Sequence, residues 1–488
     1  MKTHLPLPPK KRLGLIAMSG IRAENQELLE LGLTLPGFVE RSKVIASLPS
    51  LSLLTLAGLT PDAFELEYHE VQNLEASGAL PDHFDLVAIT SLSAQISDAY
   101  QVADRYRAAG TTVVMGGLHV SARPDEAKRH CDAVVLGEGE PVWRELLDDF
   151  SRDRLRPFYV ARERGEFDLA QAPLPRFDLL DPARYNRLTV QTSRGCPHRC
   201  AFCASSVLLT PRYKLKPVER VLAEIRAIKQ IWERPFIEFA DDNSFVHKAH
   251  YRRLMRALLR EDLRWFTECD LSVADDPELL GLMRDAGCQQ VLIGLESPRA
   301  ASLEGLEGRN NWKARRREDY LSAIERIQER GITVNGCFIL GLDGDTPEVF
   351  DEVLAFVRES GLYEVQITLL TPFPGTPLYP RLEREGRILD PGNWNLCTLF
   401  DVNLRPRHMT PEQLHQGFLR LGQALYSEAE TRRRRQAFRD RWRRRRTKTK
   451  SRRKSAESAA PAVPDRRATG TSPCSAKACD PFPTSVPG

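Results

Sequence analysis

Three cysteines lie close together in this chain of 488 residues, in the run TSRGCPHRCAFCASS. Cys196, Cys200 and Cys203 have the spacing C-x3-C-x2-C and follow an extended-type stretch at 188–192. Iron–sulfur clusters are held by cysteine thiolates, and a cluster of four irons normally takes four of them. Three thiolates on one loop leave one iron without a protein ligand, and an open coordination position is how a metal site admits a ligand. The spacing therefore predicts a reactive [4Fe-4S] cluster.

Two other uses of these cysteines are alternatives to a cluster. Together with His198 they could hold a structural zinc ion, although zinc modules usually divide their ligands between two separated pairs. A disulfide is disfavoured because three is an odd number and most of the ten cysteines are isolated, which is typical of a reducing cytoplasm. Cys474 and Cys479 lie in a low-complexity end and are not counted as ligands.

The length predicts two or three domains, because single cores rarely extend beyond about 300 residues. The composition, 42% hydrophobic and 28% charged, is globular. No run of eighteen apolar residues occurs, so no membrane-spanning helix is expected. The basic start resembles a signal peptide only faintly, since no small-residue cleavage site follows. We expect a cytoplasmic monomer.

Short apolar runs alternate with helical segments, such as 96–109, between residues 13 and 150. Five runs predict strands: LGLIAM, FELEYHEV, FDLVAIT, TTVVMGG and DAVVLGEGE. This order predicts a parallel, doubly wound α/β sheet of the flavodoxin-like type, whose ligands lie beyond the carboxyl ends of the strands. Small or polar residues stand at those ends: Ser91, Ser93, Gly116, Gly117, His119, Gly137 and Glu138. By themselves they predict a small-molecule or cofactor domain, and the lack of G-x-G-x-x-G disfavours a dinucleotide.

Six further strand patterns follow a connector at 151–185 that contains Pro and Arg. They are LTVQT, PFIEFADDN, RWFTECD, QQVLIGLES, TVNGCFILGLD and EVQITLLTPFP, separated by helical segments such as 217–232 and 276–286. Six such units predict a partial (β/α)6 barrel of the TIM type, whose active site lies at the carboxyl ends of its strands. The cysteine loop follows the first of these strands, at that end.

Polar residues interrupt the barrel strands where they end: Asp241, Asp242, Asn243, Glu268, Asp270, Glu296 and Ser297. Carboxylate and hydroxyl acceptors there would suit a ligand with an ammonium group and a ribose. Alternatively, Asp242, Asn243 and Ser297 could cap the segments that follow them. The roles of Glu268 and Asp270 stay undecided.

The cysteine spacing and the six-fold pattern together resemble the radical S-adenosylmethionine (SAM) superfamily. In that superfamily the unique iron binds the methionine part of SAM, and the reduced cluster cleaves the sulfonium. The resulting 5′-deoxyadenosyl radical abstracts a hydrogen atom from the substrate. The resemblance implies that Cys196, Cys200 and Cys203 ligate the cluster; it assigns no catalytic side chain.

Contacts to SAM are implied by the same resemblance. Phe202 occupies the aromatic place before the last cysteine, near the adenine. FADDN, with Asp241 and Asp242, is similar to the second-strand motif that receives the methionyl amino group. IGLES, with Glu296 and Ser297, matches the ribose motif of the fourth strand.

The fifth-strand element FILGLDGDT, with Ile339, resembles the family's element near the adenine, and Gly344 stands where a glutamate is frequent. The first segment is similar to the cobalamin-binding domain that precedes this barrel in one subgroup, in the pieces SLPSLSLLTLAGLTP, VAITSLSAQ, VVMGGLHV and VVLGEGEPVW. The strand-end residues named above for that segment would contact cobalamin. The D-x-H-x-x-G motif is absent, which implies no histidine beneath the metal; Trp, Leu or water could face that side.

Five segments are expected: a cobalamin-binding domain at 13–150, a linker at 151–185, a radical SAM core at 186–380, a helical extension at 381–430 like that of hopanoid methylases, and a disordered basic tail at 431–488. The resemblance implies cobalamin-dependent methylation of an unactivated carbon in a small-molecule or lipid substrate, with a reductant such as flavodoxin or ferredoxin. Alternatives are ring formation or oxidation with the same cofactors, and a zinc-containing nucleic-acid-binding protein.

The tail carries fifteen Lys and Arg and one Asp between residues 432 and 454. Such a segment could bind the phosphates of nucleic acid. An anionic membrane surface is the alternative, since Phe438 and Trp442 fall on an amphipathic basic stretch. In that case the protein would be peripheral to the membrane.

Overall fold

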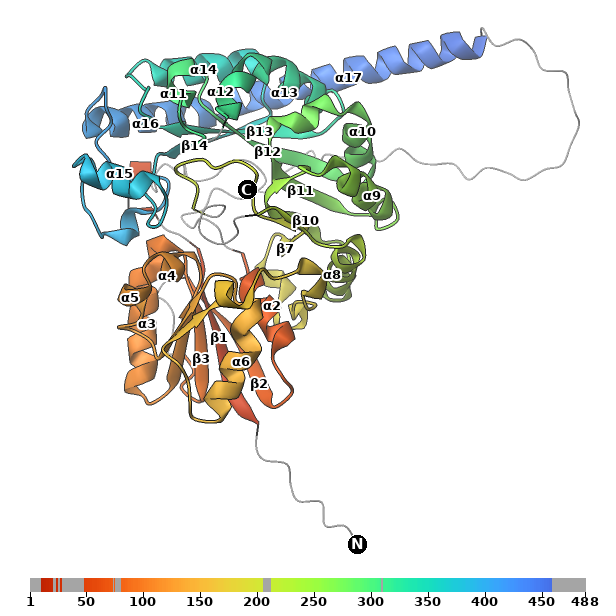
Figure 1. Cartoon of the computed structure of the whole chain (residues 1–488). Helices are drawn as coiled ribbons and strands as arrows, with labels where there is room; N and C mark the ends of the chain where they lie inside the picture. Colours follow the sequence, from red (N-terminus) through yellow and green to blue (C-terminus); the bar gives the residue numbers. More distant parts are fainter. Residues whose placement is uncertain are drawn as a thin grey trace, which may run out of the picture. The chain divides into compact units, whose positions relative to one another are not determined.

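The computed structural model describes residues 10–20, 23–24, 27–28, 48–72, 74, 80–204, 212–308 and 310–458. The described residues up to Trp442 form one compact unit, and this unit contains both large sheets (Figure 1). None of the helices in these described ranges is long and apolar enough to cross a membrane.

The first sheet has six parallel strands in the order β2-β1-β3-β4-β5-β6. The strands are β1 (Lys11–Met18), β2 (Phe64–Val71), β3 (Leu86–Thr90), β4 (Thr112–Gly116), β5 (Ala133–Leu136) and β6 (Phe158–Val160). The five strands predicted from the sequence are confirmed. β6 is an addition, because it comes from the segment that the sequence analysis treated as a connector.

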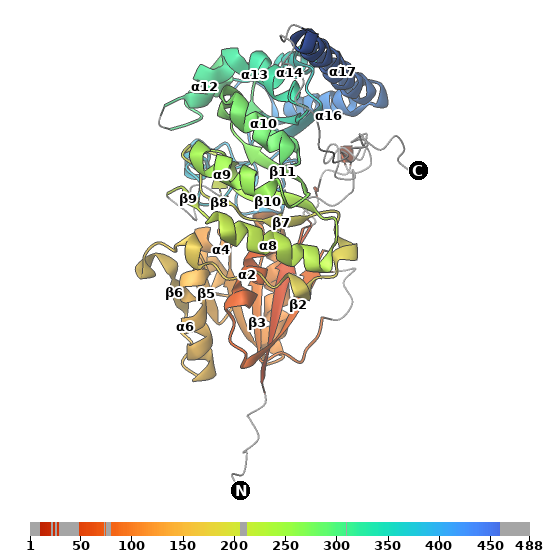
Figure 2. The same cartoon turned by 90° about the vertical axis from the view of Figure 1, so that its right-hand side faces the viewer.

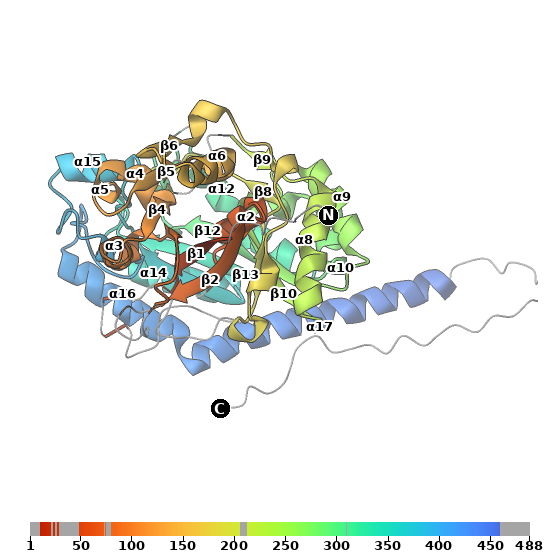
Figure 3. The same ribbon diagram turned by 90° about the horizontal axis from the view of Figure 1, so that it is seen from below.

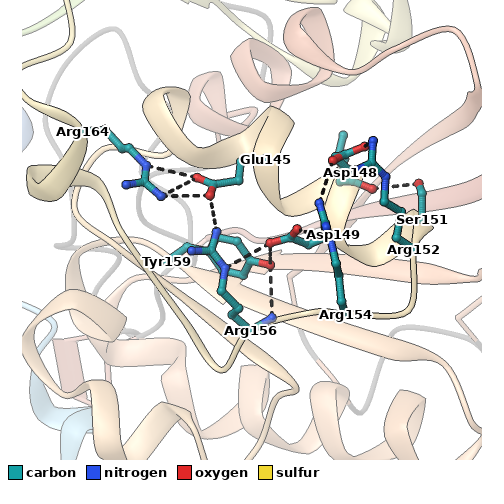
Figure 4. Close-up of polar contacts among 10 residues, drawn as sticks. Glu145, Asp148, Asp149, Ser151, Arg152, Arg154, Arg156, Tyr159 and Arg164 are labelled. Carbon is teal, nitrogen blue, oxygen red and sulfur yellow. Dashed lines mark hydrogen bonds and ion pairs between the residues drawn. The ribbon is translucent and has the colours of Figure 1, made fainter.

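Charged and polar side chains hold β6 against α6 (Glu140–Ser151), as Figure 4 shows. Asp149 accepts hydrogen bonds from the Tyr159 hydroxyl and from Arg156 Nε, both at 3.0 Å. Burial alone would raise the pKa of Asp149, but Tyr159, Arg156 and Arg154 lower it. Arg156 also pairs with Glu145. A strand of three residues that depends on such contacts has too short a periodic pattern to be recognised from the sequence.

Helices cover both faces of this sheet, which explains the continuous apolar runs of its strands. Successive side chains of a strand point to opposite faces. Val87 and Ile89 of β3 therefore pack with α3 (Ile96–Ala108). Leu86 and Ala88 pack with α2 (Leu51–Leu59) and α6 on the other face.

The second sheet also has six parallel strands, in the sequential order β14-β13-β12-β11-β10-β7. They are β7 (Leu188–Val190), β10 (Phe236–Ser244), β11 (Arg264–Cys269), β12 (Cys288–Glu296), β13 (Thr333–Leu340) and β14 (Glu364–Leu369). In the described part of the chain β7 and β14 do not pair with each other, so the barrel stays open. The predicted partial barrel is confirmed.

Helices follow the strands of this second sheet, as predicted. The expected helices at 217–232 and 276–286 are α8 (Val218–Ile231) and α10 (Pro277–Asp285). Figure 2 shows α8, α9 (Lys248–Leu258) and α10 side by side on the outer face of β10 and β11, and each contacts the next. A two-stranded antiparallel ribbon of β8 (Ser193–Arg194) and β9 (Lys214–Leu215) adjoins β10; the sequence analysis did not predict it.

The C-terminal part departs from the sequence-based prediction. Disorder from residue 431 is wrong as far as Ser458, because α17 (Glu428–Ser458) directly follows α16 (Pro411–Tyr426), which packs on α14 (Val349–Ser360) (Figure 3). Arg435 of α17 donates to Glu364 at 2.7 and 3.0 Å. These tertiary contacts stabilise a helix whose mean hydropathy is very low. Residues 459–488 lie outside the described residues.

The two aromatic residues of this helix, Phe438 and Trp442, pack against the rest of the compact unit. Phe438 is 2% exposed, and its ring centroid lies 5.2 Å from that of Tyr363. The ring of Trp442 lies against Gly331, where an added Cβ would come within 2.7 Å of it. Phe438 is therefore not available for the membrane contact that the sequence analysis considered.

Candidate cluster and cofactor site

The cysteine loop leaves the barrel after β7 and β8 and is clamped by backbone hydrogen bonds. The segment 306–308 contributes two of them, Ala201 N–H to Leu306 O at 3.0 Å and Gly308 N–H to Arg199 O at 3.1 Å. These bonds hold the loop across the carboxyl ends of the strands, where the sequence analysis expected it.

The three cysteines are free thiols; Cys200 is buried, and Cys196 and Cys203 are half-buried. Burial raises the pKa of Cys196 to about 11 and of Cys200 to about 12. Metal binding needs thiolates, so cluster assembly must displace protons from these groups. Within the described ranges, no three His, Cys, Asp or Glu side chains converge closely enough to hold a single metal ion.

His198 does not turn toward the cysteines. Its Nε2 atom lies 3.3 Å from Asp270 Oδ2, and its ring lies 4.7 Å from that of Trp312. Burial alone would raise the pKa of Asp270, but hydrogen bonds involving His198, Asn243 and Ser272 hold it well below its usual range. This arrangement disfavours the zinc alternative, in which His198 would be the fourth ligand.

Asp241 organises the chain that leads into the loop. Its Oδ1 accepts the N–H groups of Thr192 at 2.7 Å and Ser193 at 2.9 Å, and its Oδ2 accepts from the hydroxyls of Ser244 and Tyr251. Both oxygens are thus committed to protein groups, and the residue is 4% exposed. The structure gives Asp241 a positioning task, and the direct SAM contact expected from the sequence stays a prediction.

The neighbouring Asp242 has a different environment. Its Oδ2 accepts the N–H of Gly195 at 2.6 Å, directly before Cys196. Asp242 also lines a cavity, described below, so it keeps an accessible side. It is the better placed of the two aspartates to meet a ligand.

The end of β12 carries a buried ion pair that sequence reasoning missed. Glu296 accepts from Lys313 Nζ at 2.5 Å, and Lys313 also donates to Gly294 O at 2.9 Å. Burial alone would lower the pKa of Lys313, but Glu296 and Cys200 raise it. Ser297 is fully buried, and its hydroxyl oxygen accepts the N–H of Arg299 at 3.1 Å, which holds the turn after β12; α11 (Ala300–Leu303) has no side-chain cap. Lys313 gave no signal because it lies in α12 (Trp312–Arg316), a short Arg-rich helix with no apolar pattern of its own.

Glu268 points into the interior of the barrel. Its neighbours Thr267 and Cys269 are buried on the opposite face, whereas the Glu268 side chain is exposed to the interior. Desolvation inside the barrel raises its pKa to about 8, and the charges of Glu238 and Asp242 add to the effect. No described side chain hydrogen bonds to this carboxylate in the structure, which leaves it free to meet a ligand.

The expected adenine side of the site is apolar. Phe202 packs at the edge of the apolar cluster that includes Ile339 and Leu378. An added Cβ at Gly344 would lie 2.4 Å from the backbone of Ala301. No glutamate fits at this position, which explains the glycine there.

A cavity of about 500 Å³ lies beyond the carboxyl ends of the first sheet. Of the residues predicted to bind cobalamin, five line it: Ser91, Gly116, Gly117, Gly137 and Glu138. Its lining is largely apolar, and it includes Gln191, Arg194 and Asp242 from the barrel side. No histidine is among the described residues around it.

Ser93 and His119 are not among the residues that line the cavity. His119 is 1% exposed, and its ring nitrogens lie 3.1 Å from Ser93 Oγ and 3.3 Å from Glu126 Oε1. Trp394 also donates to Glu126, at 3.0 Å. In the structure His119 joins the first domain to the C-terminal extension through Glu126, and its expected cobalamin contact stays a prediction.

Gly117 shows why the cavity wall needs small residues. Its φ of +114° is unfavourable for other residues, and an added Cβ would come 2.9 Å from Thr90 Oγ1. Its neighbour Gly116 would bring a Cβ to 3.4 Å from Val135. Gly116 and Gly117 both line the cavity without a side chain, so a bulky planar cofactor can approach the backbone closely here and the residues present fit cobalamin.

Comparison with known families agrees with this arrangement. The B12 binding domain model matches residues 43–147, and the radical SAM superfamily model matches residues 190–357. Residues 190–357 therefore form a radical SAM domain, which a B12 binding domain precedes. The order of the two matched domains is that of the cobalamin-binding subgroup, so the cofactors are a [4Fe-4S] cluster, SAM and cobalamin. A domain of unknown function (DUF4070) matches 376–465, across the C-terminal extension.

Individual relatives of this radical SAM protein are distant. Bacteriochlorophyllide d C-12(1)-methyltransferase of Chlorobaculum tepidum is 27% identical over 79% of the chain and 84% of its own length. Hopanoid C-2 methylase of Rhodopseudomonas palustris is 29% identical over 72% of the chain and 67% of its own length. The methyltransferase TsrM of Kitasatospora setae shares the fold, with a TM-score of 0.61, 17% identity, and coverage of 87% of this chain and 90% of its own.

Proposed function

We propose that this radical SAM enzyme methylates an unactivated carbon of a small-molecule or lipid substrate, with methyl groups carried by cobalamin. The observation that carries the proposal is that one cavity is shared by the two domains. Gly117 and Glu138 approach it from the first sheet, and Arg194 and Asp242 approach it from the cluster side. A substrate there can meet both cofactors.

The residues of the chain have separate tasks in this proposal. Cys196, Cys200 and Cys203 hold the cluster, and Asp241 positions the loop that carries them. Lys313 and Asp242 offer a cation and a carboxylate to the charged groups of SAM. When bound, the cluster and SAM supply a hydrogen-abstracting radical and cobalamin supplies the methyl group. An external reductant such as flavodoxin or ferredoxin provides electrons.

Names of the relatives support methyl transfer. The bacteriochlorophyllide and hopanoid enzymes are both named as methylating enzymes. We propose that the substrate of this chain is likewise a small molecule or a lipid.

Isotope labelling tests the reaction. Reconstituted enzyme receives methyl-labelled SAM, reductant, cobalamin and candidate lipid extracts. We expect 5′-deoxyadenosine and a labelled product, both lost in Cys200→Ala and kept in Cys269→Ala, a buried cysteine outside the loop. Deoxyadenosine with an unlabelled, cyclised or oxidised product would favour the alternative outcome. Labelled product without deoxyadenosine would exclude the radical step.

We also propose that residues 443–454, with nine Lys and Arg and no acidic residue, bring the enzyme to anionic membrane surfaces. This suits a lipid substrate. Full-length protein should sediment with phosphatidylserine vesicles, and protein lacking residues 443–488 should not. Equal sedimentation of the two, or a preference for nucleic acid in competition, would contradict a membrane role.

A further inference from the structure

Arg194 ties the cluster loop to the first domain. It lies on β8, two residues before Cys196, and its guanidinium donates to Glu138 Oε1 and Glu140 Oε1, both at 2.7 Å. The Arg194 side chain is 17% exposed, and the two carboxylates are 9% and 8% exposed. Charge-assisted pairs with the fork geometry of arginine are strong and fix the relative orientation of their partners.

Lys214 completes this network. β8 and β9 pair so that Arg194 lies opposite Lys214, and Lys214 Nζ donates to both oxygens of Glu138 at 2.9 and 2.8 Å. Two cations of one ribbon thus face Glu138, in the loop after β5, and Glu140, at the start of α6, and the charges balance. Because the groups are largely buried, removal of one partner leaves an uncompensated charge.

The same carboxylates belong to the wall of the cofactor cavity. Glu138, Gly139 and Glu140 all line it, and so does Arg194. An added Cβ at Gly139 would come 3.1 Å from Leu56 of α2, so this loop has little room to move away. A ligand that fills the cavity therefore presses on the loop that Arg194 holds.

We infer that Arg194 is a positioning residue that couples occupancy of the cobalamin cavity to the stability of the cluster loop. The inference rests on the proposed cofactor assignment. A ligand in the cavity lies against Glu138 and Glu140, these carboxylates orient Arg194, and Arg194 fixes the chain just before Cys196. Thermodynamic linkage makes the effect reciprocal, so the cluster must raise cobalamin affinity by the same factor by which cobalamin stabilises the cluster.

Binding of hydroxocobalamin, followed by absorbance, tests the coupling without any turnover. The dissociation constant is measured for full-length protein with and without reconstituted cluster. We expect the cluster to tighten binding about tenfold in the wild type, within the usual range for coupled sites. In Arg194→Gln this factor should fall below about twofold. In Arg194→Lys, whose ammonium cannot bridge both carboxylates, it should be intermediate.

A second readout and a control separate coupling from general damage. The loss of cluster absorbance to a chelator should slow on addition of hydroxocobalamin in the wild type and not in Arg194→Gln. Arg164→Gln, which breaks exposed contacts to Glu145 away from the cavity, should behave as the wild type. If Arg194→Gln does not fold, the Arg194→Lys comparison decides in the same way.

An unchanged coupling factor in the Arg194 variants would overturn the inference. The inference would also be overturned if the wild-type affinity for hydroxocobalamin did not depend on the cluster, while the protein still bound cobalamin and cleaved SAM. Wild-type protein that binds no hydroxocobalamin at all would instead contradict the proposed function itself.

Discussion

The side-chain amide of Asn243 donates to the Sγ atom of Cys196 across 3.6 Å, which links the end of β10 to the candidate cluster loop. The same amide group donates to Asp270 Oδ2 at 2.9 Å, and the Asn243 carbonyl accepts the N–H of Asp270, also at 2.9 Å. Asn243 is 3% exposed, so it is fixed in this orientation. Hydrogen bonds to cluster sulfurs are one of the factors that set reduction potentials.

Replacement of Asn243 should therefore change the potential of the cluster. A hydrogen bond to sulfur favours the reduced, more negative form, so Asn243→Ala should lower the midpoint potential. A net bond of about 1 kcal/mol corresponds to about 40 mV for one electron. Potentiometric titration followed by electron paramagnetic resonance measures this shift. Asn393→Ala, which removes a surface contact to Asp390, should leave the potential unchanged; equal potentials in both variants would contradict the assignment.

Glu268 should make stability depend on pH. Its pKa is raised from 4.5 to about 8, so between these values the folded protein keeps a proton that the unfolded chain loses. Stability therefore falls as pH rises from about 4.5 to 8 and is level above that range. Glu268→Gln should be more stable than the wild type at pH 8.5 and equal to it near pH 4.5. Urea unfolding at both pH values measures the difference, and the exposed Glu359→Gln should show no such pH dependence.

Two glycines should respond oppositely to alanine. Gly344→Ala would force a Cβ to 2.4 Å from the backbone of Ala301, so we expect a loss of at least about 2 kcal/mol in the free energy of unfolding. Gly281 lies in α10 with open space around it. Gly281→Ala should stabilise by about 0.5–1 kcal/mol, since alanine favours the helix. Denaturant unfolding of both variants checks the prediction. A Gly344→Ala protein as stable as the wild type would contradict the close approach of Gly344 to the backbone of Ala301.

The first part of α17 should contribute to the stability of the barrel. Phe438→Ala removes a buried ring and should cost about 3–5 kcal/mol. Truncation after Trp442 should have little effect, because the compact unit ends at that residue. Thermal unfolding of the two proteins tests this contrast. A large loss of stability on truncation, with little loss in Phe438→Ala, would place the stabilising contacts beyond residue 442.

Local patterns were sufficient to predict the six strands of the barrel and the cluster loop. Most of these strands are short apolar runs with polar residues at or near their ends, and C-x3-C-x2-C is confined to eight residues. Buried parallel strands and ligands on one loop leave such signals because the residues responsible for them are neighbours in the sequence. For the same reason the sequence located Asp242, Gly117 and Glu138 at strand ends.

Only the tertiary structure distinguished the tasks of these residues. Asp241 and Asp242 are adjacent in sequence, yet they have different environments. Asp241 accepts hydrogen bonds from the backbone that enters the cysteine loop, and Asp242 lines the cavity. His119 was expected to contact a ligand, and in the structure it is buried against Ser93 and Glu126. Lys313 and Arg194 form ion pairs with residues from other segments of the chain. Burial and charge pairing depend on which elements meet in space, so no local pattern encodes them, and the same holds for the short strand β6 and the Arg-rich helix α17.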